Sequence, residues 1–142
     1  ALDTNVDEMP IEPAGPMVKD GKIVLPADDM GSGETLQGVF YFDFDQAIVR
    51  RTGHEELNKH AGVLSADRFL RVRLEGHADE RGTPEYNIAL GERRAKAIAK
   101  YLQGMGVQPS QMSVVSYGEE KPLDFSRSDS GFAKNRRGVL VY

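Results

Sequence analysis

The chain has 142 residues, 39% of them hydrophobic and 28% charged, and this suits one compact domain with a tail. It contains no cysteine, which excludes a disulfide framework, a cysteine-ligated metal site and a thiol nucleophile. The formal net charge of −4 argues against a general nucleic-acid-binding protein, and no apolar stretch approaches the ~20 residues that cross a bilayer.

The N-terminal part differs from the rest in charge and in proline content. Residues 1–38 hold eight acidic and two basic residues, whereas residues 39–142 hold 14 acidic and 16 basic residues. Four of the seven prolines also lie in the first part. Such a segment buries too little apolar surface to offset its ordering entropy. We therefore expect a flexible acidic tether over residues 1–37, with Ile23-Val24-Leu25 as its one candidate strand, and a folded domain over residues 38–142.

The domain begins with a predicted strand, a helix and a second strand. Residues 39–44 are aromatic and β-branched, which is typical of a buried strand. Thr52 and Glu55 have the spacing of a capping box and predict a helix over residues 53–65. Residues 69–75 then alternate apolar and charged side chains, which predicts a half-buried strand.

The second half is predicted to hold one long helix and two further strands. Residues 76–84 read as a loop, residues 85–103 as the longest helix, and residues 112–117 as a third strand. A long polar loop over residues 118–135 precedes a fourth strand at residues 137–142. We expect an α/β (α+β) two-layer sandwich: a mixed four-stranded sheet with two main helices on one face.

Arg94 lies on the apolar side of the long helix. With about 100° per residue, it falls within the stripe of apolar residues, and Asn87 falls there too. A buried arginine needs partners, because an unpaired buried charge costs ~3–5 kcal/mol. Three interpretations stay open: an internal ion pair, a side chain that extends its charged end to the surface, or a pocket in which the guanidinium fork binds a carboxylate.

The loop before this helix offers a charge of the opposite sign. Asp79 follows the end of a strand, where ligand sites of α/β proteins are common, and it lies near the start of the Arg94 helix. An acid and a base close together would suit a zwitterion, with its ammonium group on Asp79 and its carboxylate on Arg94.

Several motifs in this region resemble the OmpA-like domains, in the form found in peptidoglycan-associated lipoproteins. The likeness extends over roughly residues 39–142 and is carried by Gly-His-Ala-Asp-Glu-Arg-Gly-Thr-Pro-Glu-Tyr-Asn at 76–87, Leu-Gly-Glu-Arg-Arg-Ala at 90–95, Val-Ser-Tyr-Gly-Glu-Glu-Lys-Pro at 115–122 and Lys-Asn-Arg-Arg-Gly-Val-Leu-Val-Tyr at 134–142.

The resemblance implies non-covalent binding of peptidoglycan through meso-diaminopimelate of the stem peptide, with no cofactor and no catalysis. By position, Asp79 would bind the ammonium of its D-centre and Arg94 the carboxylate. The residues implied around this pair are Phe44 and Asp45 from the end of the first strand, partly through backbone amides, Asn87 by a hydrogen bond, and Asn135 and Arg136 as supports beside the last strand.

The resemblance also implies a cellular setting. Members carry a lipid on an N-terminal cysteine at the periplasmic face of the outer membrane, and they act with the propeller protein TolB in the Tol–Pal system of envelope integrity and cell division. This chain begins at Ala1, and we expect its start to lie just after the lipidated residue, so that the acidic tether joins membrane and wall.

Three rival interpretations remain. A hydrolase is disfavoured, because His54, His60 and His77 have no metal-site spacing, and Asp43 and Asp45 should point to opposite faces of a strand. A protein-only interaction module would use Asp79 and Arg94 as an internal ion pair. Another OmpA-like protein, such as a porin tail or a flagellar stator subunit, would carry a barrel or a membrane helix ahead of this domain.

Overall fold

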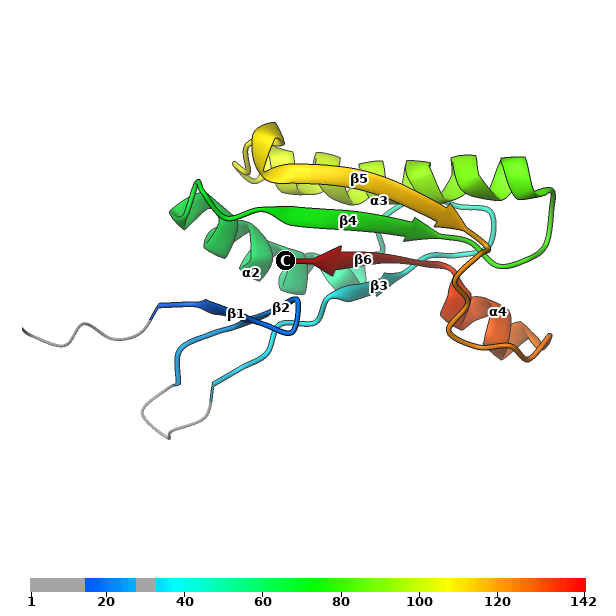
Figure 1. Cartoon of the computed structure of the whole chain (residues 1–142), viewed down its shortest axis with the longest axis horizontal. Helices are drawn as coiled ribbons and strands as arrows, with labels where there is room; N and C mark the ends of the chain where they lie inside the picture. The colour runs from blue at the N-terminus through cyan, green and yellow to red at the C-terminus, as the bar shows by residue number, and fades with distance from the viewer. Residues whose placement is uncertain (1–14, 28–32) are drawn as a thin grey trace, which may run out of the picture.

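A mixed four-stranded sheet is the centre of the fold. The computed structural model describes residues 15–27 and 33–142, and its sheet has the order β3-β6-β4-β5 (Figure 1). Strands β4 and β5 are parallel, whereas β6 is antiparallel to both of its neighbours. The strands are β3 (Val39–Tyr41), β4 (Val72–His77), β5 (Met112–Gly118) and β6 (Arg137–Val141). The predicted mixed sheet is confirmed.

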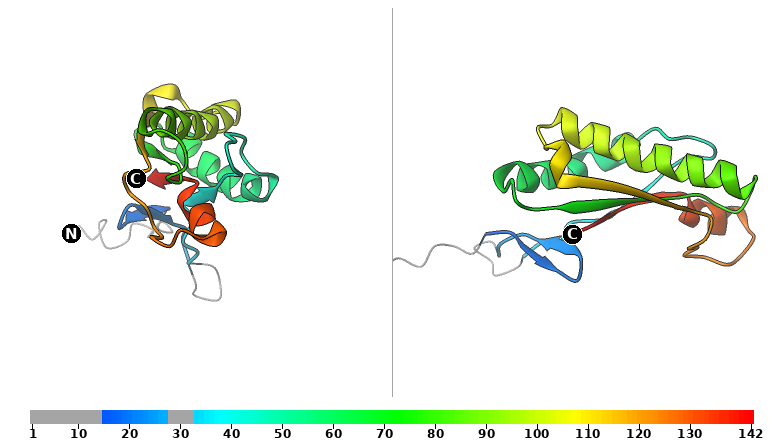
Figure 2. Two further views of the ribbon diagram at one scale, coloured as in Figure 1. Left: turned by 90° about the vertical axis from the view of Figure 1, so that its right-hand side faces the viewer. Right: turned by 45° about the horizontal axis from the view of Figure 1, so that its top comes forward.

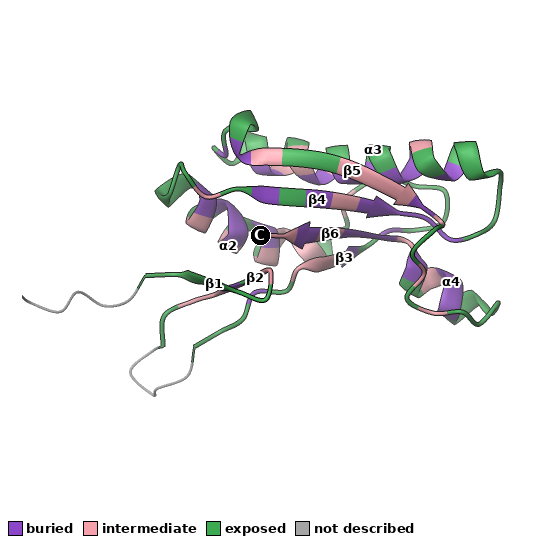
Figure 3. Cartoon of the chain, viewed as in Figure 1, coloured by how far each residue is buried: buried purple, intermediate pink, exposed green. Residues whose placement is uncertain are grey.

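Two helices cover one face of this sheet, as the alternating sequence pattern predicted. Helix α2 (His54–Ala66) and helix α3 (Pro84–Gly104) lie on the same side (Figure 2). Buried side chains of both helices form one cluster with those of the strands, among them Leu57, Leu74 and Ile98. The buried positions follow β4 and β6 in the middle of the sheet (Figure 3). None of the helices in the described residues is both long and apolar enough to cross a membrane.

Three local predictions were wrong, each for a local reason. Strand β3 ends at Tyr41 rather than residue 44, because a turn follows in which Asp45 has a φ of 55°. The capping box does not form: a 3-10 turn, η1 (Arg51–Gly53), precedes α2, whose first residue follows Gly53 without a side-chain cap. The predicted long loop contains a short helix, α4 (Asp129–Asn135), whose N-terminus is capped by the Ser128 side chain.

Part of the expected tether packs on the domain. A hairpin is formed by β1 (Met17–Lys19) and β2 (Lys22–Val24), and the predicted short strand is thus present, shifted by one residue. The Asp20-Gly21 turn has positive φ at both residues, which suits a tight hairpin connection. Gly21 accepts a hydrogen bond of 3.0 Å from the Tyr142 amide.

Two apolar side chains of this segment are buried, one in β2 and one after it. Ile23 and Leu36 are each only 1% exposed, and the Leu36 amide donates to the Ile23 carbonyl at 2.9 Å. The expected flexible tether over residues 1–37 thus includes a hairpin at residues 17–24 and two buried apolar side chains, Ile23 and Leu36. Residues 1–14 and 28–32, on which the rest of that prediction falls, lie outside the described residues.

Helix α3 and strand β4 touch backbone to backbone beside the end of the sheet. A Cβ atom on Gly76 would lie 1.7 Å from the Gly91 carbonyl oxygen, and one on Gly91 would lie 2.3 Å from Ser116 Oγ. Both positions therefore require glycine. This contact sets the distance between the helix and the strand from which the candidate site is built.

A short 3-10 turn and a buried glutamine close the other end of the sheet. The turn, η2 (Pro109–Gln111), leads into β5, and the Gln111 side-chain amide donates to the backbone carbonyls of Leu64, Asp67 and Leu70 at 2.9 to 3.0 Å. These bonds tie the end of α2 to the loop that enters β4.

Candidate functional site

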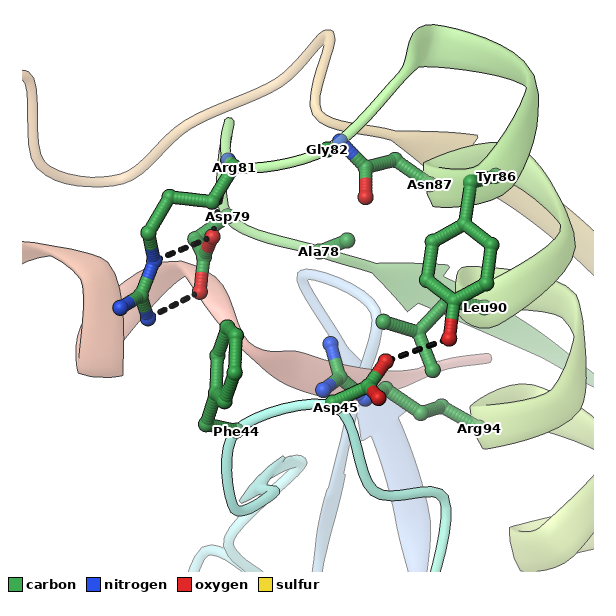
Figure 4. A pocket seen from close by; sticks show the side chains of 10 residues that line it. All are labelled: Phe44, Asp45, Ala78, Asp79, Arg81, Gly82, Tyr86, Asn87, Leu90 and Arg94. Atoms are coloured by element: carbon green, nitrogen blue, oxygen red, sulfur yellow. Dashed lines mark hydrogen bonds and ion pairs between the residues drawn. The ribbon is translucent and has the colours of Figure 1, made fainter.

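A pocket of about 220 Å³ lies where β4 ends and α3 begins. It is open to solvent, and three chain segments supply its walls: the turn after β3, the loop after β4 and the first half of α3 (Figure 4). Its lining consists of Phe44, Asp45, Ala78, Asp79, Arg81, Gly82, Tyr86, Asn87, Leu90 and Arg94. Both charges that the sequence singled out, Asp79 and Arg94, thus line one pocket, as predicted.

Arg94 is fully buried and has no carboxylate partner among the described residues. Its guanidinium donates to three backbone carbonyls: from Nε to Gln46 at 2.8 Å, from Nη1 to His77 at 2.9 Å and from Nη2 to Asp43 at 3.1 Å. These bonds fix the plane of the group at the pocket floor. A guanidinium has five N–H donors, so one on each terminal nitrogen is left for a ligand.

The electrostatics of Arg94 favour an anionic ligand. Burial, together with the nearby Arg136, lowers the pKa of Arg94 to about 10, so the group is still charged at neutral pH. A buried cation whose partners are neutral dipoles gains most from a carboxylate that brings both charge and two acceptors. The internal Asp79–Arg94 ion pair of the rival interpretation does not form.

Asp79 lies across the pocket and is paired with a different arginine. It is 4% exposed, and Arg81 binds it from Nε at 3.1 Å, from Nη2 at 2.8 Å and from its own backbone amide at 3.0 Å. Arg136 approaches the same carboxylate to 3.6 Å. Burial alone would raise the pKa of Asp79, but the hydrogen bonds from Arg81 outweigh it and lower that pKa below its usual value.

The third wall comes from the turn after β3. Phe44 is exposed and lies flat against the Arg81 guanidinium, 4.2 Å from ring centre to the guanidinium carbon. The Asp45 carboxylate accepts a hydrogen bond from the Tyr86 hydroxyl of α3. Asp43 pairs instead with Arg50 at 2.6 Å, so the two aspartates have separate partners. The strand that was expected to carry both aspartates does not reach them, because β3 ends at Tyr41.

The remaining predicted residues divide into one lining residue and two neighbours. Asn87 lines the pocket, and its side-chain amide donates to Glu119 at 2.9 Å. Arg136 donates to the Phe42 carbonyl at 2.9 Å and lies beside Asp79. Asn135 lies outside this pocket: its amide oxygen accepts from the Leu123 and Asp124 amides, so it shapes the loop before α4.

Five lining residues were not expected from the sequence: Ala78, Arg81, Gly82, Tyr86 and Leu90. A signal existed for two of them. Arg81 stands two residues after Asp79, which is close enough for its backbone and side chain to reach one carboxylate. Tyr86 lies two turns before Arg93 on α3, on the side that faces the turn after β3.

His77, just before Asp79, is buried without a hydrogen-bond partner for either ring nitrogen in the described part of the chain. Burial and the nearby Arg137 lower its pKa to about 4, so it is neutral at pH 7. Within residues 15–27 and 33–142, no group of three His, Cys, Asp or Glu side chains has the arrangement of a metal site.

Comparison with known proteins identifies a family and several relatives that this chain resembles. The model of the OmpA family matches residues 41–136. The chain is 50% identical over 102 residues to the peptidoglycan-associated lipoprotein of Pasteurella multocida, a match that covers 72% of this chain and 68% of that protein. It is 48% identical over 102 residues to the protein of that name from Haemophilus influenzae, covering 72% and 67%.

A solved structure agrees with these matches. The crystal structure of the peptidoglycan-associated lipoprotein from Burkholderia pseudomallei superposes with a TM-score of 0.74 at 40% identity, covering 75% of this chain and 90% of that one. The family resemblance predicted from the motifs is confirmed: this chain belongs to the OmpA family, and its relatives include the peptidoglycan-associated lipoproteins.

Proposed function

We propose that this domain binds peptidoglycan without covalent chemistry, by holding meso-diaminopimelate of the stem peptide in the pocket of Asp79 and Arg94. The name of the relatives supports peptidoglycan as the polymer that is bound, and the charges of the pocket support diaminopimelate as the part of it that enters the pocket. The D-centre of diaminopimelate carries an ammonium and a carboxylate on one carbon, so it needs an acid and a base that share one small pocket.

The observation that carries this proposal is the state of the Arg94 guanidinium. It is buried, it is held flat by three carbonyls, and it forms no ion pair with an acid among the described residues, although Asp79 and Asp45 lie in the same pocket. A planar fork prepared in this way matches a carboxylate with two hydrogen bonds, and an ammonium group in its place would not. Phe44 would close the pocket over the ligand, and Asn135 and Arg136 would support its walls.

We infer a structural role in the cell envelope from the same family likeness. The protein would act at the periplasmic face of the outer membrane, held there by an N-terminal lipid, and would link that membrane to the wall as part of the Tol–Pal system with TolB as a partner. It would not be an enzyme: the acids and guanidinium groups of the pocket are held in hydrogen bonds with one another, with Tyr86 or with backbone carbonyls, and the pocket lining contains no serine, cysteine, lysine or histidine side chain beside a base.

Sedimentation with purified sacculi tests the proposal. Asp79→Asn should lower wall binding at least about tenfold, because a neutral amide replaces a charge-assisted partner of the ligand ammonium. Arg94→Lys should lower it similarly, since an ammonium cannot reproduce the planar fork.

The matched control is Lys96→Ala, which removes an exposed cation of the same helix that pairs with Glu92. It should bind like the wild type. Because Arg94 also holds three carbonyls, circular dichroism must show that each variant is folded. Wild-type binding by folded Asp79→Asn and Arg94→Lys proteins would contradict the site assignment.

A further inference from the structure

The carboxylate of Asp79 already accepts three hydrogen bonds within the protein itself. A carboxylate offers about four acceptor positions on its two oxygens. Arg81 fills two on Oδ1, from its backbone amide at 3.0 Å and its Nε at 3.1 Å, and one on Oδ2 from Nη2 at 2.8 Å. Arg136 lies 3.6 Å from Oδ2. Three of the four positions are therefore filled, and a ligand ammonium finds at most one, which lies beside the positive charge of Arg136.

Arg81 is held in this place by more than the ion pair. Its guanidinium lies between two aromatic rings, 4.2 Å from the centre of Phe44 and 4.6 Å from that of Phe132. Its side chain is nevertheless 38% exposed, whereas Asp79 is 4% exposed. The arginine can therefore swing into solvent, but the acid cannot move out to meet a ligand.

We infer that Arg81 is a resident cation in the ammonium subsite, and that a ligand's ammonium group binds Asp79 by exchanging with the Arg81 guanidinium. The inference rests on the proposed function and deepens it. Exchange offsets part of the gain from binding the amine, since the Arg81 guanidinium gives up its hydrogen bonds as the ammonium group takes them. In the wild type the amine would then add less to the affinity than an unoccupied Asp79 would allow.

The consequence is a gain in affinity when Arg81 is removed. Arg81→Met keeps a long apolar stem between Phe44 and Phe132 but removes the charge and the side-chain donors. Asp79 then keeps only Arg136 and the backbone amide of residue 81, and an ammonium group can bind it without competition. We expect about tenfold tighter binding of a stem peptide with a free distal amine, the size of one charge-assisted hydrogen bond.

Titration calorimetry should use two probes: a tripeptide stem that ends in meso-diaminopimelate, and the same peptide acetylated on its distal amine. Arg81→Met should tighten the first about tenfold and leave the second unchanged. Arg127→Met is the matched control, because Arg127 pairs with Glu80 at 2.8 Å close to the pocket but does not line it. It should change neither affinity.

Equal or weaker binding of the free-amine peptide by Arg81→Met would overturn the inference, since Arg81 would then be a bystander or a ligand contact. Failure of the proposed function looks different: neither peptide would bind the wild-type protein. Nuclear magnetic resonance of the wild type gives a readout that needs no variant. The Arg81 Nε–Hε signal should shift when the free-amine peptide saturates the pocket, and an unshifted signal at saturation would also overturn the inference.

Discussion

The buried hairpin can be tested with one pair of substitutions. Ile23 lies on β2 and is 1% exposed, and its register partner Val18 on β1 is 46% exposed. Truncating a fully buried isoleucine to alanine costs ~2–5 kcal/mol, from lost apolar burial and from the cavity that remains. Because the whole free energy of unfolding of a domain is about 5–15 kcal/mol, Ile23→Ala should weaken this protein substantially.

The assay is thermal and urea unfolding followed by circular dichroism. For a chain of this size, each kcal/mol lowers Tm by about 3–5 °C, so Ile23→Ala should lower it by at least about 6 °C. Val18→Ala, at an exposed position of the same hairpin, should change the free energy of unfolding by no more than ~0.5 kcal/mol. If Ile23→Ala unfolds at the wild-type temperature, the hairpin is detached in solution and the flexible tether predicted from composition was right.

The other predictions concern pH, packing and the ligand. In the unfolded chain His77 takes up a proton near pH 6.5, whereas burial holds its pKa in the folded protein to about 4. The free energy of unfolding should therefore fall by about 2 kcal/mol from pH 7 to pH 5. His77→Gln should reduce this dependence on pH, measured by urea titrations. Gly91→Ala should lower Tm, because the added Cβ would lie 2.3 Å from Ser116 Oγ. Gly62→Ala should instead raise Tm, because an added Cβ in helix α2 would meet no atom within 4 Å and alanine favours the helix more than glycine does. A lysine-containing stem peptide should bind at least about tenfold more weakly than the diaminopimelate form in titration calorimetry, because Arg94 loses its carboxylate. Amidation of that carboxylate should weaken binding for the same reason. Acetylation of the distal amine should weaken binding through Asp79. Equal affinities for the lysine and diaminopimelate stems would place recognition elsewhere.

The periodic parts of the fold followed from the sequence. Alternation over residues 69–75 predicted β4, and the apolar stripe of residues 85–103 predicted α3, because both patterns report burial on one side. The same reasoning singled out Arg94, because it is a charge inside an apolar stripe. A charged residue at a buried position is informative, since burial makes it costly without partners.

The irregular parts did not follow, because their stability comes from contacts between distant segments. Composition indicated that the first part is poor in apolar residues, yet it holds the buried Ile23 and Leu36, and Gly21 of its hairpin pairs with the Tyr142 amide of the domain. The Asp20-Gly21 pair was an available turn signal between Val18 and Ile23. The three carbonyls on Arg94 come from the turn after β3 and the end of β4, and no local pattern predicts such a set.

The backbone contact between Gly76 and Gly91 also limits how the pocket can adapt. Arg94 stands three residues after Gly91 on α3, and Asp79 stands three residues after Gly76 at the end of β4. No layer of side chains separates the two backbones here, so repacking elsewhere in the core has nothing to compress between them. The distance between Asp79 and Arg94 is therefore fixed in the folded protein, so that little conformational entropy is lost on this side of the pocket when a ligand binds. Adjustment to a ligand is then left to the exposed side chains of the pocket, Phe44 and Arg81.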